Sequence, residues 1–397
     1  MWWWAACAPE TDTDLADDVL HGVLLAPLDE HGLDDSDERD THPSFDRTAD
    51  GGWIAAWDAG AEGAEKAIVR EVAEDGSPLG DPDILVSEPG AGFLTPDVQV
   101  DGEDWYAVVR VADRIEVLRG TVGSVVSTAG PTSVGADGIA VGFWTAPDLA
   151  VVPDGVVIGW WEGTLAPGSA ATYRVAHASF DLAVDVPVEV GDSDDVGSPI
   201  AVEPTPDGGT LVAWSTLNAD GAGTIEVRRF SAEGDPGAAF TLGGELAEPA
   251  SRPSLAVDPS GRWAVGWRVQ DDAQHGLGVY AATFDASDAP VGETWSPGLA
   301  AGTANRLDLS AHDGILAFAW EEVGVGTDVF VQLLSLADTS ILSGAVRVHD
   351  DPTGDQARPH VELRPGEGGL DVAVAWESVP ADGSASSVRF RVFRVLR

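Results

Sequence analysis

The sequence contains little cysteine and little positive charge. Cys7 is the single cysteine among 397 residues, so no disulfide can form within the chain. Lysine and arginine together number 21, against 67 acidic residues, and Lys66 is the single lysine. The net charge of −46 argues against nucleic acid and anionic membrane surfaces as partners, because both require basic patches. A solvated acidic shell explains this charge and is compatible with weak calcium binding.

Long apolar runs and helical periodicity are also missing. No run of 18 apolar residues occurs, so no segment is long enough for a transmembrane helix. Short runs rich in alanine, valine and tryptophan alternate with turn-forming segments such as DPSG at residues 258–261. This pattern predicts an all-β fold.

One stretch, RPSLAVDPSGRWAVGW at residues 252–267, recurs along the chain. Its proline returns every 51 to 54 residues, apart from one double step between Pro253 and Pro359. We place a copy without proline at Arg306 and a copy without tryptophan near Arg110, which gives seven copies of four short runs each. The repeat predicts a seven-bladed β-propeller of four-stranded antiparallel blades, because a closed ring buries both faces of every sheet.

The tryptophan that ends each apolar run is expected to pack between blades. Large aromatic side chains at a repeated strand position are usually core residues, although a ring of exposed, ligand-stacking tryptophans is the alternative. The residues concerned are Trp57, Trp160, Trp214, Trp267, Trp320 and Trp376.

The two ends of the chain complement each other. The last copy stops at Arg397 after its third strand, while an apolar segment at residues 21–28 (HGVLLAPL) precedes the first copy. We therefore expect this N-terminal strand to complete the last blade. The predicted organisation is a propeller over residues 19–397, preceded by a lipobox-like start and an acidic tether over residues 1–18.

Several segments resemble a repeat that is common in secreted and surface β-propeller proteins of bacteria. They are PSLAVDPSG, VAWSTLNADG, RRFSAEGDP and VAWES, and the resemblance covers residues 19–397. In addition, Ala5-Ala6-Cys7 resembles the end of a bacterial lipoprotein signal, which implies lipidation of Cys7. The resemblance implies an extracytoplasmic protein, either secreted or held at the outer membrane or cell surface through a lipid anchor alone.

Motifs of known chemistry are missing. The sequence has no Gly-x-Ser-x-Gly nucleophile elbow, no HExxH zinc motif and no phosphate-binding loop, and DPSGRW at residues 258–263 matches the sialidase turn only in part. We expect no catalytic residue, no metal site and no cofactor. Weak surface calcium sites are conceivable in the acidic loops at residues 34–40, 191–197 and 349–355.

The candidate binding site is one mouth of the central channel, where the loops entering the first strands should gather. The residue before each repeat proline gives one position per blade: His42, Thr95, Ala146, Ser198, Arg252, Asn305 and Arg358. Among these we select His42, Ser198, Arg252, Asn305 and Arg358 as ligand-binding residues. Arginine suits carboxylate or sulfate recognition. The alternative is that both arginines only pair with nearby acidic groups.

These observations predict a monomeric, non-catalytic propeller of the cell surface that binds a protein or glycan partner. One alternative is a secreted hydrolase of the glycosidase type, which would use a pair of carboxylates. Another is a purely structural envelope protein. Propeller folds serve many roles, so architecture alone does not decide between them.

Overall fold

The computed structural model describes residues 22–34, 38–61, 63–134, 146–163, 170–193, 198–217, 223–243, 249–271, 275–299, 303–324, 326–351, 353–366 and 368–397. Every regular element in these ranges is a β-strand, as the alternating apolar runs predict. In the same ranges no helix has the length and apolar character needed to cross a membrane.

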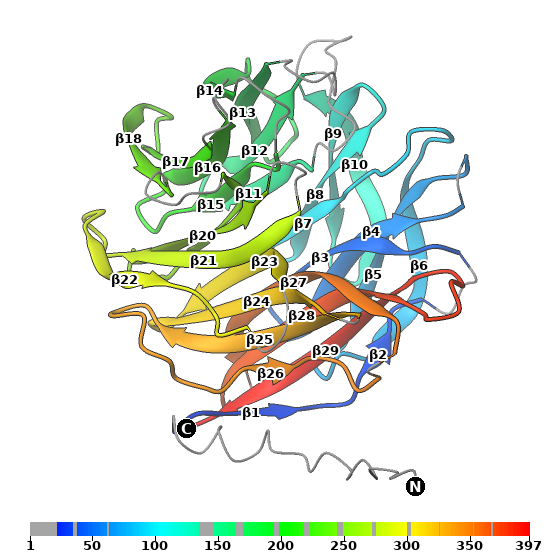
Figure 1. The fold of residues 1–397 in the computed structure, drawn as a ribbon. Coiled ribbons are helices and arrows are strands. Elements are labelled where there is room, and N and C mark those ends of the chain that lie inside the picture. The colour runs from blue at the N-terminus through cyan, green and yellow to red at the C-terminus, as the bar shows by residue number, and fades with distance from the viewer. Residues whose placement is uncertain are drawn as a thin grey trace, which may run out of the picture.

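The first four blades follow one another along the chain, and each is an antiparallel sheet of four consecutive strands (Figure 1). Blade one consists of β3 (Thr41–Arg47), β4 (Trp53–Ala59), β5 (Lys66–Val72) and β6 (Pro78–Ser87). Blade two consists of β7 (Asp97–Asp101), β8 (Asp104–Val111), β9 (Arg114–Thr121) and β10 (Ser124–Val134). Blade three consists of β11 (Asp148–Val152), β12 (Gly155–Glu162), β13 (Ala171–Ser179) and β14 (Val188–Ser193). Blade four consists of β15 (Ala201–Pro204), β16 (Thr210–Leu217), β17 (Gly223–Phe230) and β18 (Pro236–Leu242).

The remaining three blades complete the ring. Blade five consists of β19 (Ala250–Val257), β20 (Trp263–Gln270), β21 (Gly276–Phe284) and β22 (Pro290–Trp295). Blade six consists of β23 (Thr303–His312), β24 (Ile315–Val323), β25 (Thr327–Ser335) and β26 (Val346–Arg347). Blade seven consists of β27 (Asp355–Gly366), β28 (Gly369–Val379), β29 (Ser387–Leu396) and the N-terminal strands β1 (Leu24–Pro27) and β2 (His31–Gly32). Each first strand contacts the first strand of the next blade, and β27 contacts β3. The predicted seven-bladed propeller is confirmed.

The N-terminal strand closes the ring, as predicted. Figure 1 shows β1 lying alongside β29, which brings the start of the described chain to its end. The pairing is antiparallel, with Leu25 opposite Val395, and Leu25 is almost fully buried. Further along, Leu33 is fully buried and packs in the cluster that also contains Phe45 of blade one and Phe390 of blade seven. The N-terminal segment therefore joins the last blade to the first.

The repeated tryptophans fill the spaces between blades. Each of the six is at most 2% exposed: Trp57, Trp160, Trp214, Trp267, Trp320 and Trp376. They lie in apolar clusters with valine, alanine and leucine side chains, and several of these clusters combine residues of neighbouring blades. The structural interpretation of these residues is confirmed, and they cannot stack on a ligand.

Hydrogen bonds between first strands tie the blades together around the channel. A side chain of one first strand accepts a hydrogen bond from a backbone N–H of the next: Val98 donates to Ser44, Leu149 to Asp97, Val202 to Asp148, Leu309 to Ser254 and Val361 to Asp308. These bonds occupy the same position at five of the seven contacts between blades, so they fix how those neighbouring blades are aligned. They also provide an independent check on which residues are equivalent.

This check corrects the sequence alignment in three blades. In blade six, Asp308 matches Ser254, so Arg306 occupies the position of Arg252, and Asn305 lies one residue earlier. In blade four, Ala201 opposes Ala213, and Ser198 is displaced in the same way. In blade two, Val109 takes the tryptophan position, which we had assigned near Arg110. The proline marks position poorly because it lies one residue earlier in blade four and is missing from blade six.

Candidate functional site

The central channel contains a cavity of about 240 Å³ lined by residues from the first strand, or the turn entering it, of all seven blades. At its mouth lie His42, Arg252, Arg306 and Arg358, each within a bulge of its first strand, and Thr95, just before β7. Deeper in the cavity, carboxyl groups replace the arginines. The channel is therefore basic at the mouth and acidic further in, although the chain as a whole carries a net charge of −46.

Four mouth residues have an unusual backbone conformation. The φ angles of His42, Thr95, Arg252 and Arg358 lie between 43° and 53°, in the left-handed region, and each of these residues precedes a proline. Residues other than glycine rarely adopt this backbone region, and holding a residue there costs on the order of 1–3 kcal/mol of conformational free energy. Hydrogen bonds hold three of the four in place. The N–H of Thr95 donates to Asp58, that of Arg252 to Ser198 and that of Arg358 to Glu321.

His42 and Asp58 form a hydrogen-bonded pair at the mouth. The imidazole Nδ1 lies 2.9 Å from Oδ2 of Asp58, while Oδ1 of Asp58 accepts the N–H groups of Leu94 and Thr95 at 2.8 Å each. Burial and the positive charges of surrounding arginines, Arg358 first among them, hold the pKa of His42 well below its usual value. His42 is therefore neutral at physiological pH. Within the described residues its Nε2 has no hydrogen-bond partner.

Burial has the opposite effect on the aspartate of this pair. It raises the pKa of Asp58 to about 7, although the hydrogen bonds from Leu94 and Thr95 lower it. Above that pH the ionised carboxylate accepts the Nδ1–H of His42, which leaves the lone pair on Nε2. The pair therefore has the arrangement of a general base with its orienting carboxylate.

Two of the three arginines at the mouth already have partners, and so does Arg268 behind them. Arg358 donates to Thr41 at 2.9 Å and forms an ion pair with Glu377. Arg306 lies 3.6 Å from a carboxylate oxygen of Glu321. Arg268 of β20 donates to Asn305, Ser251 and Gln270. In the part of the chain that the structure describes, the guanidinium of Arg252 makes no hydrogen bond or ion pair.

A layer of carboxyl groups lies deeper in the channel. Asp97 and Asp148 are hydrogen-bonded to each other, and burial raises the pKa of both, that of Asp148 to about 7. Burial also raises the pKa of Glu362 to about 7 and that of Glu203 well above its usual range. Asp97 and Asp148 accept the inter-blade hydrogen bonds described above, so these two groups are structural.

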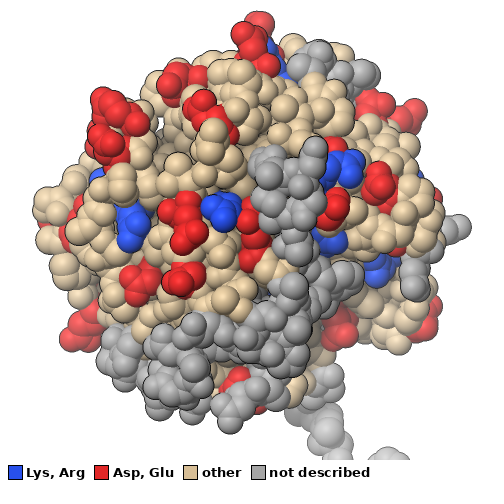
Figure 2. Space-filling model, turned by 90° about the horizontal axis from the view of Figure 1, so that it is seen from above, with Lys and Arg blue, Asp and Glu red and all other residues tan. Residues whose placement is uncertain are grey.

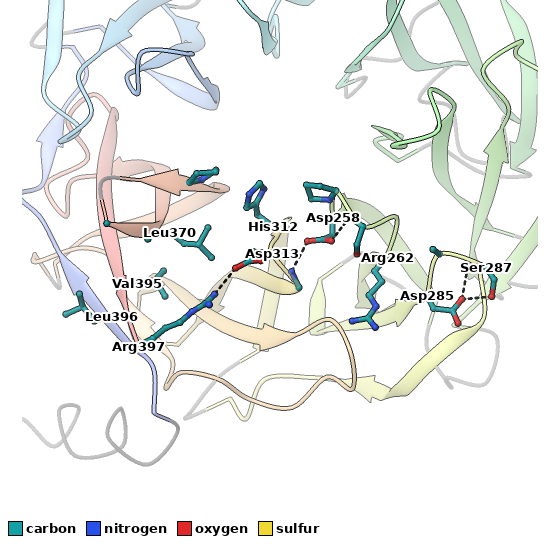
Figure 3. A pocket seen from close by; sticks show the side chains of 17 residues that line it. Asp258, Arg262, Asp285, Ser287, His312, Asp313, Leu370, Val395, Leu396 and Arg397 are labelled. Atoms are coloured by element: carbon teal, nitrogen blue, oxygen red, sulfur yellow. Dashed lines mark hydrogen bonds and ion pairs between the residues drawn. The ribbon is translucent and has the colours of Figure 1, made fainter.

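A second cavity, of about 1560 Å³, opens at the opposite end of the first strands (Figure 3). Its lining comes from blades five, six and seven. The labelled charged groups pair with each other, as Arg397 does with Asp313 at 3.4 Å, or lie at tight turns, as Asp285 does with Ser287. No hydrogen-bonded histidine–carboxylate pair lies among its lining residues. Although this cavity is larger, only the mouth of the channel combines a hydrogen-bonded histidine–carboxylate pair with nearby arginines among the lining residues of these two cavities and their partners.

The rest of the surface is acidic. Figure 2 shows carboxylates spread over one face of the molecule, with a few basic groups among them. No group of three or more histidine, cysteine or acidic residues that could hold a metal ion occurs among the described residues. The three loops considered for calcium each include residues outside the described ranges, at 35–37, 194–197 and 352, and Cys7 also lies outside them.

The structure places the five predicted residues in two groups. His42, Arg252 and Arg358 line the cavity. Ser198 and Asn305 stand behind it as supports, since Ser198 accepts the N–H of Arg252 and Asn305 bridges Arg268 and Glu321.

The sequence alignment missed Arg306 and the second-strand residues Asp58, Arg268, Glu321 and Glu377. A signal for the second-strand residues was present. Each directly follows a repeat tryptophan, at a position that the alternation of a strand turns away from the tryptophan face.

No known family model matches the chain, and no curated protein matches it in sequence. Among solved structures, a protein of unknown function from Dyadobacter fermentans has 9% identity and a TM-score of 0.59, covering 94% of this chain and 100% of that one. An alpha-L-arabinanase from Penicillium chrysogenum, solved with arabinobiose, has 10% identity and a TM-score of 0.52 over 92% and 98% of the two chains. The polysaccharide lyase Uly1 has 9% identity and a TM-score of 0.53 over 93% and 99%. At these identities the likeness shows the fold alone.

These comparisons contradict our expectation that the chain is not an enzyme. Two of the three propellers are enzymes by name, the arabinanase and the lyase. The expectation rested on missing sequence motifs, and such motifs detect only sites whose residues are close in sequence. The mouth is assembled from residues between Thr41 and Glu377, so a site of this kind leaves no local motif.

Proposed function

We propose that the chain is a glycan-cleaving enzyme whose reacting centre is the mouth of the central channel, with His42 as the general base. The observation that carries the proposal is the His42–Asp58 pair, whose imidazole lines the cavity and lies beside three arginines. Two propellers of the same fold that are named as glycan enzymes support glycans as the first substrates to test.

Each group at the mouth has a role in this chemistry. Asp58 is fixed by two backbone N–H groups and holds the imidazole by its Nδ1. The nearby arginines keep the imidazole neutral, so that Nε2 can accept a proton from water or from the substrate. The same positive charges stabilise negative charge that develops on the substrate during the reaction.

Activity assays on purified variants test the proposal. Release of reducing ends from a panel of neutral and acidic polysaccharides should fall about 10²–10⁴-fold in His42→Ala, the usual contribution of a general base. Asp58→Asn should also lower the rate at which reducing ends are released, because the imidazole would lose its orienting carboxylate. Because Asp58 must ionise to orient the imidazole, kcat/KM of the wild type should rise with pH through about 7.

His177→Ala is the matched control. His177 also pairs with aspartates, Asp154 and Asp185, but it lies on β13 of blade three, outside the channel cavity, and its loss should leave the rate unchanged. Near-ultraviolet circular dichroism checks that each variant is folded. A wild type without activity on the whole panel, or a folded His42→Ala with full activity, would refute the proposal.

A further inference from the structure

The arginine cluster at the mouth is costly for the fold. Burial and the charges of Arg306, Arg268 and Arg358 lower the pKa of Arg252 well below its usual value. Like charges at close range repel each other most strongly where water is excluded. Two carboxylates, Glu321 and Glu377, form ion pairs with Arg306 and Arg358, so Arg252 and Arg268 are left without an ion pair among the described residues.

Arg252 differs from the other arginines of the cluster in the partners of its side chain. Arg268, Arg306 and Arg358 are bound to protein groups, and the last two line the mouth. Arg252 lines the cavity, and its side chain has no partner among the described residues. It is also held in the left-handed conformation, with a φ of 52°, at a bulge that separates its pairing from that of the rest of β19. Bulges next to functional sites commonly turn a side chain toward the site.

We propose that the guanidinium of Arg252 binds an oxyanion of the substrate. The glycan recognised at the mouth would then carry a carboxylate or a sulfate group. A guanidinium presents a planar set of N–H donors that matches both groups. This inference rests on the proposed function, because it takes the anion to be part of the glycan that His42 acts on. Binding can nevertheless be measured apart from cleavage.

The geometry explains why Arg252 would select an anion and not a neutral sugar. A neutral hydroxyl would leave the excess charge of the cluster uncompensated, whereas an oxyanion neutralises part of it. Desolvated ion pairs with good hydrogen-bond geometry discriminate strongly, because the wrong partner leaves a buried charge unpaired. The anion would sit close to His42, since Arg252 is among the groups whose charge acts on that imidazole.

The test uses the full chain with His42→Gln, which removes the proposed base and keeps bound glycan intact. Calorimetric titration is carried out with oligogalacturonate, a sulfated dextran and neutral dextran. We expect one or both anionic glycans to bind, and neutral dextran to bind at least 10-fold more weakly. Adding Arg252→Gln should weaken the anionic complex about 10-fold to 100-fold, the range for a hydrogen bond to a charged group.

Arg394→Gln is the matched control, because it removes the same charge from an exposed position on β29. The glycan whose affinity depends on Arg252 identifies the group as carboxylate or sulfate. Equal losses in both arginine variants, or equal binding of neutral dextran, would overturn the inference. Binding that depends on Arg252 in a chain that cleaves no glycan would overturn the proposed function alone.

Discussion

Closure of the ring by the N-terminal segment can be tested with one side chain, Leu33. It is fully buried between blade seven and blade one, in the cluster that contains Phe45, Trp53 and Phe390. Its N–H donates to the carbonyl of Val388 at 3.0 Å, and this bond would survive truncation of the side chain. Leu33→Ala therefore removes only the packing that joins the two blades.

The magnitude follows from the burial. Truncation of a fully buried leucine to alanine destabilises proteins by about 2–5 kcal/mol, through lost transfer energy and the cavity left behind. The aromatic rings around Leu33 are themselves packed edge to face, Phe45 against both Trp53 and Phe390, so they have little freedom to fill the space. We expect a loss of about 3 kcal/mol in the free energy of unfolding.

Urea unfolding followed by tryptophan fluorescence measures this loss, and Leu24→Ala is the control. Leu24 lies on β1 of the same N-terminal segment but is 36% exposed, so its truncation should cost roughly 0.5 kcal/mol or less. Removal of residues 1–33 should lower the midpoint further and promote aggregation, because it leaves the edge of β29 unpaired. Equal midpoints for Leu33→Ala and the wild type, or an unchanged midpoint after the truncation, would refute the reasoning.

Two further predictions concern pH and the N-terminus. Burial raises the pKa of four carboxyl groups to about 7: Asp40, Asp58, Asp148 and Glu362. The folded state therefore binds more protons than the unfolded state between about pH 4 and 7, and stability that is present at low pH is lost as pH rises through 7. Urea midpoints should be higher at pH 5 than at pH 8, and the reverse order would show that these groups are ionised in the folded protein. At the N-terminus, Cys7 remains the predicted site of lipidation, and fatty-acid labelling of the protein expressed from its native gene should disappear in Cys7→Ala. A soluble, unlabelled wild type would contradict this prediction.

The architecture could be predicted because it depends on local and repeated signals. Each blade carries its own turns, such as Asp258-Pro259-Ser260-Gly261, and six of the seven blades carry the buried repeat tryptophan, so the same fold is indicated independently by each copy. Closure of the ring followed from counting strands, since blade seven lacked one and the N-terminal segment supplied one.

The site could be predicted only in part, because its geometry depends on bulges. A bulge adds one residue to a strand and moves every later side chain to the opposite face, and in blade six no proline marks it. The proline lies one residue earlier in blade four and is missing from blade six, so the proline alignment selected Ser198 and Asn305, which support the mouth, and passed over Arg306, which lines it. The partners of the mouth residues lie on second strands, and only the three-dimensional structure brings Asp58 to His42 or Glu377 to Arg358.

A chain with a net charge of −46 can still receive an anion at Arg252, because charges act over different distances. At physiological ionic strength the screening length is about 8 Å, so carboxylates on the outer rim have little effect in the middle of the ring. Inside the mouth, water is limited and the arginines are close, so their excess charge is weakly screened. The acidic shell therefore governs solubility and encounters between molecules, while Arg252 and its neighbours govern what the channel holds. Different parts of the sequence determine these two properties. The loops carry the acidic shell, and the residues around the first-strand bulges carry the arginines of the mouth.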